Sequence, residues 1–154
     1  MSEHRAIEAA EQAASVMSVA GMPRMPARVL MALLAAPAEG YTAADLRDRL
    51  GVSAAAVSGA VRYLETLHFI RRRSLPGHRR ERYEMVSDSW FGVMTANAPV
   101  YLRLADLIDT IHAEQEDSDA AAHATEMSAF LRFMARRMPE LVEEWEAERA
   151  ALEG

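Results

Sequence analysis

The segment from residue 42 to residue 85 restricts the fold of this chain more than any other part of the sequence. Leu46 and Leu50 lie four positions apart, so they share one face of a short helix that we expect over residues 43–50. Gly51 suits the left-handed residue that commonly ends a helix. A second helix after so short a turn would complete a helix-turn-helix.

Capping residues and apolar spacing support both helices. Thr42 is a suitable N-cap for the first helix, and Asp45, three residues later, can complete a capping box. Ser53 can cap the second helix. The apolar residues of that second helix recur at helical spacing: Val57, Ala60, Val61, Leu64 and Leu67.

A basic β-hairpin is expected after the two helices. Residues 71–75 and 82–86 resemble two strands, and a Pro-Gly pair turns the chain between them. The tip, residues 78–80, holds one His and two Arg, and side chains at a hairpin tip have little to pack against. We therefore expect a winged helix-turn-helix: a mainly α fold with a small β-wing.

The charge of this segment differs from that of the rest of the chain. Residues 42–85 contain nine Arg against five acidic residues, whereas the whole chain has a formal net charge of −6. A basic region in an acidic protein, located on the elements that would touch DNA, indicates a phosphate-binding surface. The alternative is an ordinary solvated charged face.

Composition narrows the class of protein. With 154 residues, of which 51% are hydrophobic and 26% charged, the chain is expected to fold as an ordinary cytoplasmic protein. The absence of Cys rules out disulfides and thiolate catalysis, and no apolar run approaches the ~20 residues of a membrane helix. All 17 basic residues are Arg, which a GC-rich genome explains better than phosphate recognition, because Arg replaces Lys throughout.

Two helices are expected before this region. Residues 2–19 form a weakly amphipathic helix that needs a partner, either another subunit or the C-terminal helices. Residues 24–36 form a second helix, and residues 37–41 a loop. The floor of the helix-turn-helix would come from one face of that second helix: Val29, Leu30, Leu33 and Leu34.

Helices are also expected after the wing. One spans residues 90–112 with an interruption near Pro99, and an acidic stretch at 114–119 connects it to the next. The last helix covers residues 120–152 and is expected to bend at Pro139.

The predicted organisation has three parts. Residues 1–20 form an N-terminal dimerisation helix, residues 21–87 the DNA-binding domain, and residues 88–154 a C-terminal helical dimerisation region. Long apolar faces outside a domain with its own core favour a two-fold dimer interface. The alternative is a monomer in which these helices form a cap.

Three stretches resemble the MarR superfamily of bacterial repressors: GMPRMPARVLMALL, TAADLRDRLGVSAAAVSGAVRYLETLHFIRR and PGHRRERYEMVSDSW. The similarity covers residues 21–90 and is greatest to the GbsR-like branch. It implies a homodimeric transcription regulator whose recognition helix enters the major groove and whose wing arginine enters the minor groove. It also implies dimer helices from both termini and a pocket between the two lobes, where a small effector would weaken DNA binding.

Two positions depart from the family pattern. Family members usually have Gly just after the recognition helix, where this chain has His68, a residue that tolerates a left-handed backbone better than most. The family wing often has an acid before the tip arginine, where this chain has His78, which would add charge when protonated.

The candidate DNA-binding residues lie on the second helix and the hairpin. Short or polar side chains outside the apolar stripe would let the helix enter the major groove: Ser53, Ala54, Ala55, Ser58, Gly59 and Arg62. Arg79 is the candidate for minor-groove insertion, and Arg80 and Arg82 are candidates for phosphate contacts. On the first strand, either Arg72 or its two Arg neighbours would face DNA, since alternate residues point opposite ways. The plainer interpretation is an exposed Ala/Ser helix face.

The candidate effector pocket consists of Met and aromatic side chains that the family geometry would bring together: Met17, Met22, Met25, Tyr41, Trp90, Phe91, Met94 and Tyr101. Such residues are more often part of a core. The sequence has no metal-ligand motif, no cofactor motif and no catalytic constellation, so we expect a protein without a cofactor that is not an enzyme.

Two functions from different classes remain. The first is a homodimeric regulator of transcription that binds double-stranded DNA, acts as a repressor and is released by a small molecule. The second is a winged-helix module for protein interaction, with a helical dimer scaffold and no specific operator. The wing arginines favour the first, because an interaction module has no need of them beside a helix of small residues.

Overall fold

The computed structural model describes residues 2–77, 79–86, 92, 95–114 and 118–153. The chain divides into two compact units, Met1–Ser89 and Trp90–Gly154, which are described separately. None of the helices described is long and apolar enough to cross a membrane.

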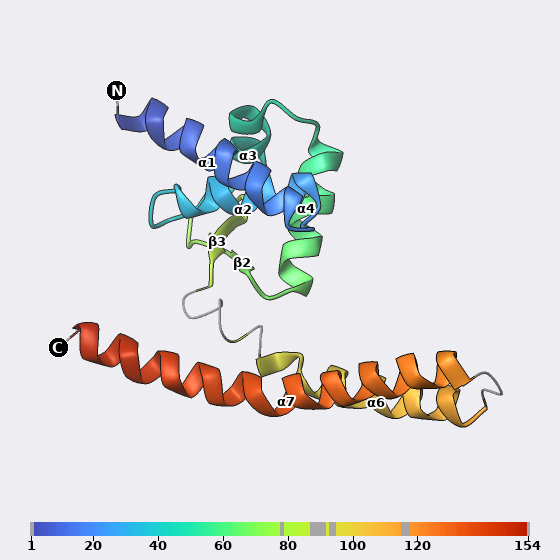
Figure 1. Cartoon of the computed structure of the whole chain (residues 1–154). Coiled ribbons are helices and arrows are strands. Elements are labelled where there is room, and N and C mark those ends of the chain that lie inside the picture. The colour runs from blue at the N-terminus through green and yellow to red at the C-terminus, as the bar shows by residue number, and fades with distance from the viewer. Residues whose placement is uncertain (1, 78, 87–91, 93–94, 115–117, 154) are drawn as a thin grey trace. The chain divides into compact units, whose positions relative to one another are not determined.

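The first unit contains four helices and a three-stranded antiparallel sheet (Figure 1). The sheet order is β1-β3-β2, so the last strand of the wing lies in the middle. In chain order the elements are α1 (Ser2–Val19), α2 (Arg24–Leu34), β1 (Tyr41–Thr42), α3 (Ala43–Leu50), α4 (Ala54–Thr66), β2 (Ile70–Arg73) and β3 (Arg82–Met85). The predicted winged helix-turn-helix is confirmed, with α3 over the expected residues.

The core of the first unit forms where α2, α3 and α4 meet. Leu30, Leu46 and Leu64, one from each helix, are all 0% exposed. Burying three such side chains contributes about 5–9 kcal/mol of transfer free energy, which fixes the three helices against one another. Leu34, predicted to join this floor, is instead 58% exposed, because α2 ends there and the residue lines a shallow groove beside the following loop.

The N-terminal helix has a partner inside its own unit. Ala14 is 1% exposed in the core cluster, and Ala10, Ala13 and Met17 pack against that cluster. Small residues let α1 lie close to α2, and this contact explains how a weakly amphipathic helix is held. The sequence predicted another subunit or the C-terminal helices as the partner of this helix. The structure shows that α1 also packs on α2.

The strand β1 was not predicted. Tyr41 pairs with Tyr83 and Thr42 with Arg82, directly before α3 begins. Two residues are too few for an alternating pattern to be visible in a sequence. The short strand matters because it attaches the wing to the start of the helix-turn-helix.

The residue that follows the C-cap of α4 is not glycine, yet its backbone adopts the left-handed conformation. His68 has φ 59°. Its N–H donates to the carbonyl of Glu65 at 3.0 Å, and that of Phe69 donates to the carbonyl of Leu64 at 3.0 Å. These two bonds define a Schellman motif, in which Gly is the usual residue. The prediction that His68 accommodates the left-handed backbone is confirmed.

Replacing this residue should therefore stabilise the protein. In His68→Gly the left-handed strain is relieved while no buried contact is lost, because His68 is exposed. We expect the free energy of unfolding to rise by about 1 kcal/mol in urea titrations. His68→Ala is the control, since it removes the imidazole without relieving the strain. Equal stabilisation by both variants would contradict the explanation.

The second unit is a pair of packed helices, α6 (Ala98–Ala113) and α7 (Ser118–Glu153). Ala105, Ile108 and Ala135 are buried between them. Arg132 on α7 donates to Asp106 at 2.9 Å and Asp109 at 2.7 Å on α6, which raises the pKa of Arg132. Many large apolar side chains of these two helices are exposed: Val100, Leu102, Leu104, Leu107, Ile111, Met127, Phe130, Phe133, Leu141 and Trp145.

The predicted boundaries in this unit are met in part. Helix α6 starts at Ala98 after a turn at Asn97, as the interruption near Pro99 suggested. Helix α7 continues through Pro139. The expected helix start at Trp90 lies outside the described residues.

Candidate nucleic-acid interface

The outer face of α4 is a continuous exposed surface of small side chains. Its predicted contact residues are all exposed: Ser53, Ala54, Ala55, Ser58, Gly59 and Arg62. The opposite face holds the buried residues Val57, Ala60, Val61 and Leu64. The hydroxyl of Ser53 accepts a bond from the N–H of Ala56 at 3.2 Å, so this residue is the helix cap as predicted.

Gly59 has no steric role within this unit. A Cβ at this position would meet no atom within 4 Å. Gly in a helix costs about 0.5–1 kcal/mol relative to Ala. The fold therefore gives no reason for Gly here, whereas a close approach by another molecule does.

The helix α3 is anchored by the capping box that the sequence predicted. The N–H of Thr42 donates to Asp45 Oδ2 at 2.8 Å, its hydroxyl donates to the same oxygen at 2.7 Å, and the N–H of Asp45 donates to Thr42 Oγ1 at 3.1 Å. The bonds from the Thr42 backbone and side chain lower the pKa of Asp45. The box therefore contributes stability above the ordinary pKa of Asp, and this contribution disappears as the pH falls through the lowered value.

Two of the strand arginines are paired with one glutamate. Arg71 Nε lies 2.7 Å and Arg73 3.1 Å from the carboxylate of Glu84, whose side chain is 11% exposed. Burial raises the pKa of Glu84, but the bonds from Arg71 and Arg73 outweigh it and the net shift is downward. These two arginines therefore neutralise a buried carboxylate in the sheet.

The arginine between them is also paired. Arg72 Nε lies 2.8 Å from Glu65 on α4, and a second nitrogen lies 3.4 Å from Glu81. Its guanidinium lies 5.8 Å from the centre of the Tyr83 ring. The hydrogen bond that Arg72 donates to Glu65 raises the pKa of Arg72. The structure thus places this predicted DNA contact in a network that joins the wing to α4.

The remaining arginines have few partners. Among the described residues, the guanidinium groups of Arg62 and Arg79 make no hydrogen bond or ion pair. Arg80 is exposed, and its charge helps lower the pKa of Asp45. Arg82 donates to the carbonyl of Gly40 at 3.0 Å.

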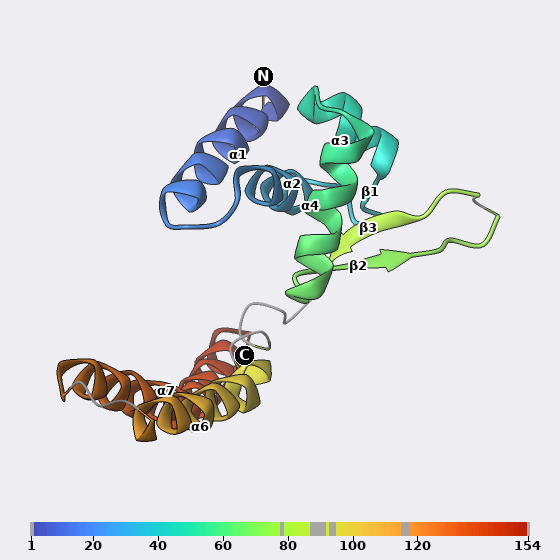
Figure 2. The same cartoon turned by 90° about the vertical axis from the view of Figure 1, so that its right-hand side faces the viewer.

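The wing projects beyond the helices of its unit (Figure 2). A cavity of about 350 Å³ separates its tip from the start of α3, and Arg79, Arg80 and Arg82 line it together with Thr42, Asp45 and Gly77. Gly77 turns the hairpin with φ 81°, which confirms the predicted turn. His78 lies outside the described residues.

The unpaired positive charge is therefore confined to fewer arginines than the sequence indicated. Residues 42–85 contain nine arginines, and the three on β2 form ion pairs with Glu65, Glu81 and Glu84. The sequence pattern alone did not predict these glutamates as partners of the arginines. One signal was available for Glu84, because the hairpin register sets it opposite Arg71.

Five of the eight predicted effector residues are described, and they belong to two different units. Met17, Met22, Met25 and Tyr41 pack against the core of the first unit, and Tyr101 belongs to the second. Three others lie outside the described residues: Trp90, Phe91 and Met94. No group of acidic or His side chains suited to a metal is found in the part of the chain that the structure describes.

Comparisons with known proteins place this architecture in a family. A model described as "MarR family" matches residues 20–81, and one described as "MmpR5-like MarR family transcriptional regulator" matches residues 88–148. A comparison with curated proteins found no match.

A solved structure of a transcriptional regulator shows the same fold, and structures of MepR are more distantly similar. A crystal structure titled as that of a transcriptional regulator is 20% identical, with a TM-score of 0.81 over 93% of this chain and 99% of that one. Staphylococcus aureus MepR, described as a regulator of the multidrug efflux pump MepA, is 20% identical over 83% of this chain and 91% of its own, with a TM-score of 0.43. A MepR–DNA complex is 17% identical over 83% and 89%, with a TM-score of 0.42.

The two family matches are consecutive, and each falls mainly on one of the two structural units. Regulators of this family are DNA-binding transcription factors and not enzymes. With a helix-turn-helix, a wing and both family matches in place, the chain belongs to the MarR family of transcriptional regulators.

Proposed function

We propose that this protein is a homodimeric repressor that inserts α4 into the major groove of its operator and Arg79 of the wing into the minor groove. The observation that carries the proposal is the exposed row of small side chains on α4, flanked by Arg62 and by a wing tip whose arginines have no acidic ion-pair partner among the described residues.

Each part of this surface suits one part of DNA. Small side chains such as Ser58 and Ala55 allow a helix to approach base edges, where a hydroxyl can bond and a methyl can meet thymine. Gly59, which the fold does not require, adds space at the same face. Arg79 can enter a narrow minor groove, and Arg80 and Arg82 are suited to phosphates.

The dimer is proposed from exposed apolar side chains on the second unit. Val100, Leu107 and Phe130 are between 45% and 58% exposed, which is unusual for large apolar residues on helices of a monomer. We propose that residues 1–20 and 88–154 contribute the dimer helices and residues 21–87 the DNA-binding domain. A two-fold dimer would present two α4 helices to half-sites about one DNA turn apart.

The proposal also covers the release signal, the cellular compartment, the branch of the family and the direction of regulation. A small effector that weakens DNA binding would act as the release signal, with the protein working in the cytoplasm. Within the family, the similarity of residues 21–90 favours the GbsR-like branch. The direction of regulation is proposed to be repression.

Hydroxyl-radical footprinting on the DNA upstream of the protein's own gene tests this function. We expect two protected regions whose centres are about 10 base pairs apart, or a multiple of this distance. Uniform weak protection along the fragment would contradict sequence-specific binding and would favour the protein-interaction module.

Arg79→Ala tests the wing. We expect weaker operator binding and a slope of log Kd against log salt that is smaller by about one, because one phosphate-proximal charge is lost. Fluorescence anisotropy over a salt series measures both quantities. The control is Arg136→Ala, which removes an exposed arginine from α7. If both variants bind like the wild type, the minor-groove role of Arg79 is wrong.

A further inference from the structure

One guanidinium links α4 to both sides of the hairpin. Arg72 on β2 bonds to Glu65, in the last turn of α4, through two nitrogens: Nε lies 2.8 Å from one carboxylate oxygen and a terminal nitrogen 3.2 Å from the other. Its other terminal nitrogen lies 3.4 Å from Glu81, which directly precedes β3. Paired bonds fix the orientation of a guanidinium as well as its position. We call these three residues the wing clamp.

The wing clamp lies where the paired strands of the hairpin end. Arg73 and Arg82 form the last pair of the ladder, and Arg72 belongs to the pair before it, opposite Tyr83. The ring of Tyr83 is part of the buried core, and the guanidinium of Arg72 lies 5.8 Å from its centre. Beyond this point the described residues of the tip are exposed, apart from the half-buried Leu75. No core therefore sets the direction of the tip.

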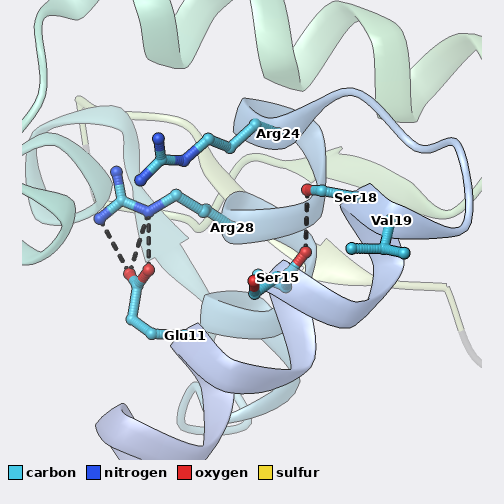
Figure 3. Close-up of a pocket in the computed structure, with 7 residues that line it drawn as sticks. Glu11, Ser15, Ser18, Val19, Arg24 and Arg28 are labelled. Carbon is cyan, nitrogen blue, oxygen red and sulfur yellow. Dashed lines mark hydrogen bonds and ion pairs between the residues drawn. The ribbon is translucent and has the colours of Figure 1, made fainter.

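The helices of the first unit are held together by other contacts. Their apolar core is buried, and Figure 3 shows a second arginine bridge, in which Arg28 of α2 bonds to Glu11 of α1 at 2.8 Å. Arg28 also donates to the carbonyl of Leu50, at the end of α3, at 3.0 Å. The core and this bridge hold α1, α2 and α3, whereas the wing clamp joins the hairpin to α4.

The wing clamp matters more for geometry than for folding. The side chains of Glu65 and Arg72 are 25% and 47% exposed, and ion pairs so open to water add little stability. DNA recognition makes a stricter demand, because α4 and the wing must reach two grooves at the same time. As an acid, Glu65 cannot bind phosphate itself, so a direct contact with the DNA backbone does not explain it.

We propose that Glu65 is a positioning residue for operator binding. Acting through Arg72, it holds the wing at the angle at which α4 and Arg79 enter neighbouring grooves together. Arg72 then serves to align the wing and not to bind phosphate. This inference rests on the proposed function, because it requires that α4 and the wing both bind DNA.

Fluorescence anisotropy of the full-length Glu65→Gln variant tests this role, on the DNA upstream of the gene and on a nonspecific duplex. The substitution removes a negative charge, so electrostatics alone would tighten DNA binding. We expect instead about tenfold weaker operator binding, with nonspecific affinity unchanged or higher, because nonspecific binding depends on charge and not on alignment. The matched control is Glu39→Gln, which removes an exposed glutamate of the same unit and should bind the operator at least as tightly as the wild type.

Variants of Arg72 separate alignment from phosphate contact. Arg72→Lys keeps the charge but loses the paired bonds, so it should weaken operator binding, whereas a phosphate contact would survive. Arg72→Gln should weaken binding without changing the slope of log Kd against log salt, and a slope smaller by about one would reveal a phosphate contact and overturn the proposal. Adding Glu65→Gln to Arg72→Gln should cause no further loss, because both changes remove the same link.

Hydrogen exchange of the protein without DNA provides an independent measurement. The amides of residues 71–73 and 82–85 should exchange faster in Glu65→Gln than in the wild type, with those of α2 unchanged. Wild-type operator affinity or wild-type hairpin exchange in Glu65→Gln would each overturn the proposal. A wild-type protein that does not prefer the upstream DNA would overturn the proposed function and the role of Glu65 in it. Hairpin exchange distinguishes these failures, because it is measured without DNA.

Discussion

Gly40→Ala is expected to lower the free energy of unfolding of the first unit by about 3 kcal/mol. Two costs combine in this number: about 1–2 kcal/mol for an L-residue in the left-handed region and about 1–3 kcal/mol for overpacking. Gly40 has φ +72°, and an added Cβ would overlap the carbonyl oxygen of Tyr83 and lie 2.9 Å from its carbon. The backbone of β1 would have to move away from β3.

The same substitution is expected to disturb the wing, because the backbone of Gly40 forms a hydrogen bond with a wing residue. Its carbonyl accepts the bond from Arg82, and Thr42, two residues on, caps α3. Urea unfolding followed by circular dichroism measures the loss. Gly51→Ala is the matched control, since its φ of +65° carries the same strain but its Cβ would meet nothing within 4 Å. If the two variants lost equal stability, close approach of the strands would not be the cause.

Ser58→Glu is expected to weaken operator binding at least about 100-fold. The side chain of Ser58 lies on the exposed face of α4. A carboxylate there would face the negative charge of the DNA groove, and bringing like charges together costs several kcal/mol. The variant should keep its fold, because the position is exposed and outside the apolar stripe of α4.

Anisotropy titration with the operator measures this effect, and thermal melts check the fold. The control Ser58→Ala removes the hydroxyl without adding charge, and we expect a loss of about tenfold or less. If Ser58→Glu binds as tightly as Ser58→Ala, α4 does not enter the groove and the recognition face lies elsewhere.

Most of the first unit was predictable because the sequence signals that define it are local. The capping box at Thr42, the left-handed Gly51 and the cap at Ser53 each depend on neighbouring residues, and all three are present. The left-handed conformation of His68 was also foreseen from the place where Gly is usual. Such features require no knowledge of tertiary contacts.

What the sequence did not predict depends on residues distant in the chain. The strand β1 forms only because β3 is already present beside it. The ion pairs of Arg72, a predicted DNA contact, join it to Glu65 and Glu81, which lie seven and nine residues away in the sequence. The packing of α1 on α2 likewise includes the ion pair of Glu11 with Arg28, 17 residues apart. Periodicity does not reveal such pairings.

We propose that the face formed by α4 and the wing recognises one DNA sequence. A gel-shift titration of the purified protein on its own upstream DNA tests this recognition, with unlabelled nonspecific DNA as competitor at physiological salt. We expect a single shifted species that survives competition, with specific binding at least about 1,000-fold tighter than nonspecific binding. A shift that disappears with the competitor would contradict sequence-specific recognition and leave only a basic surface.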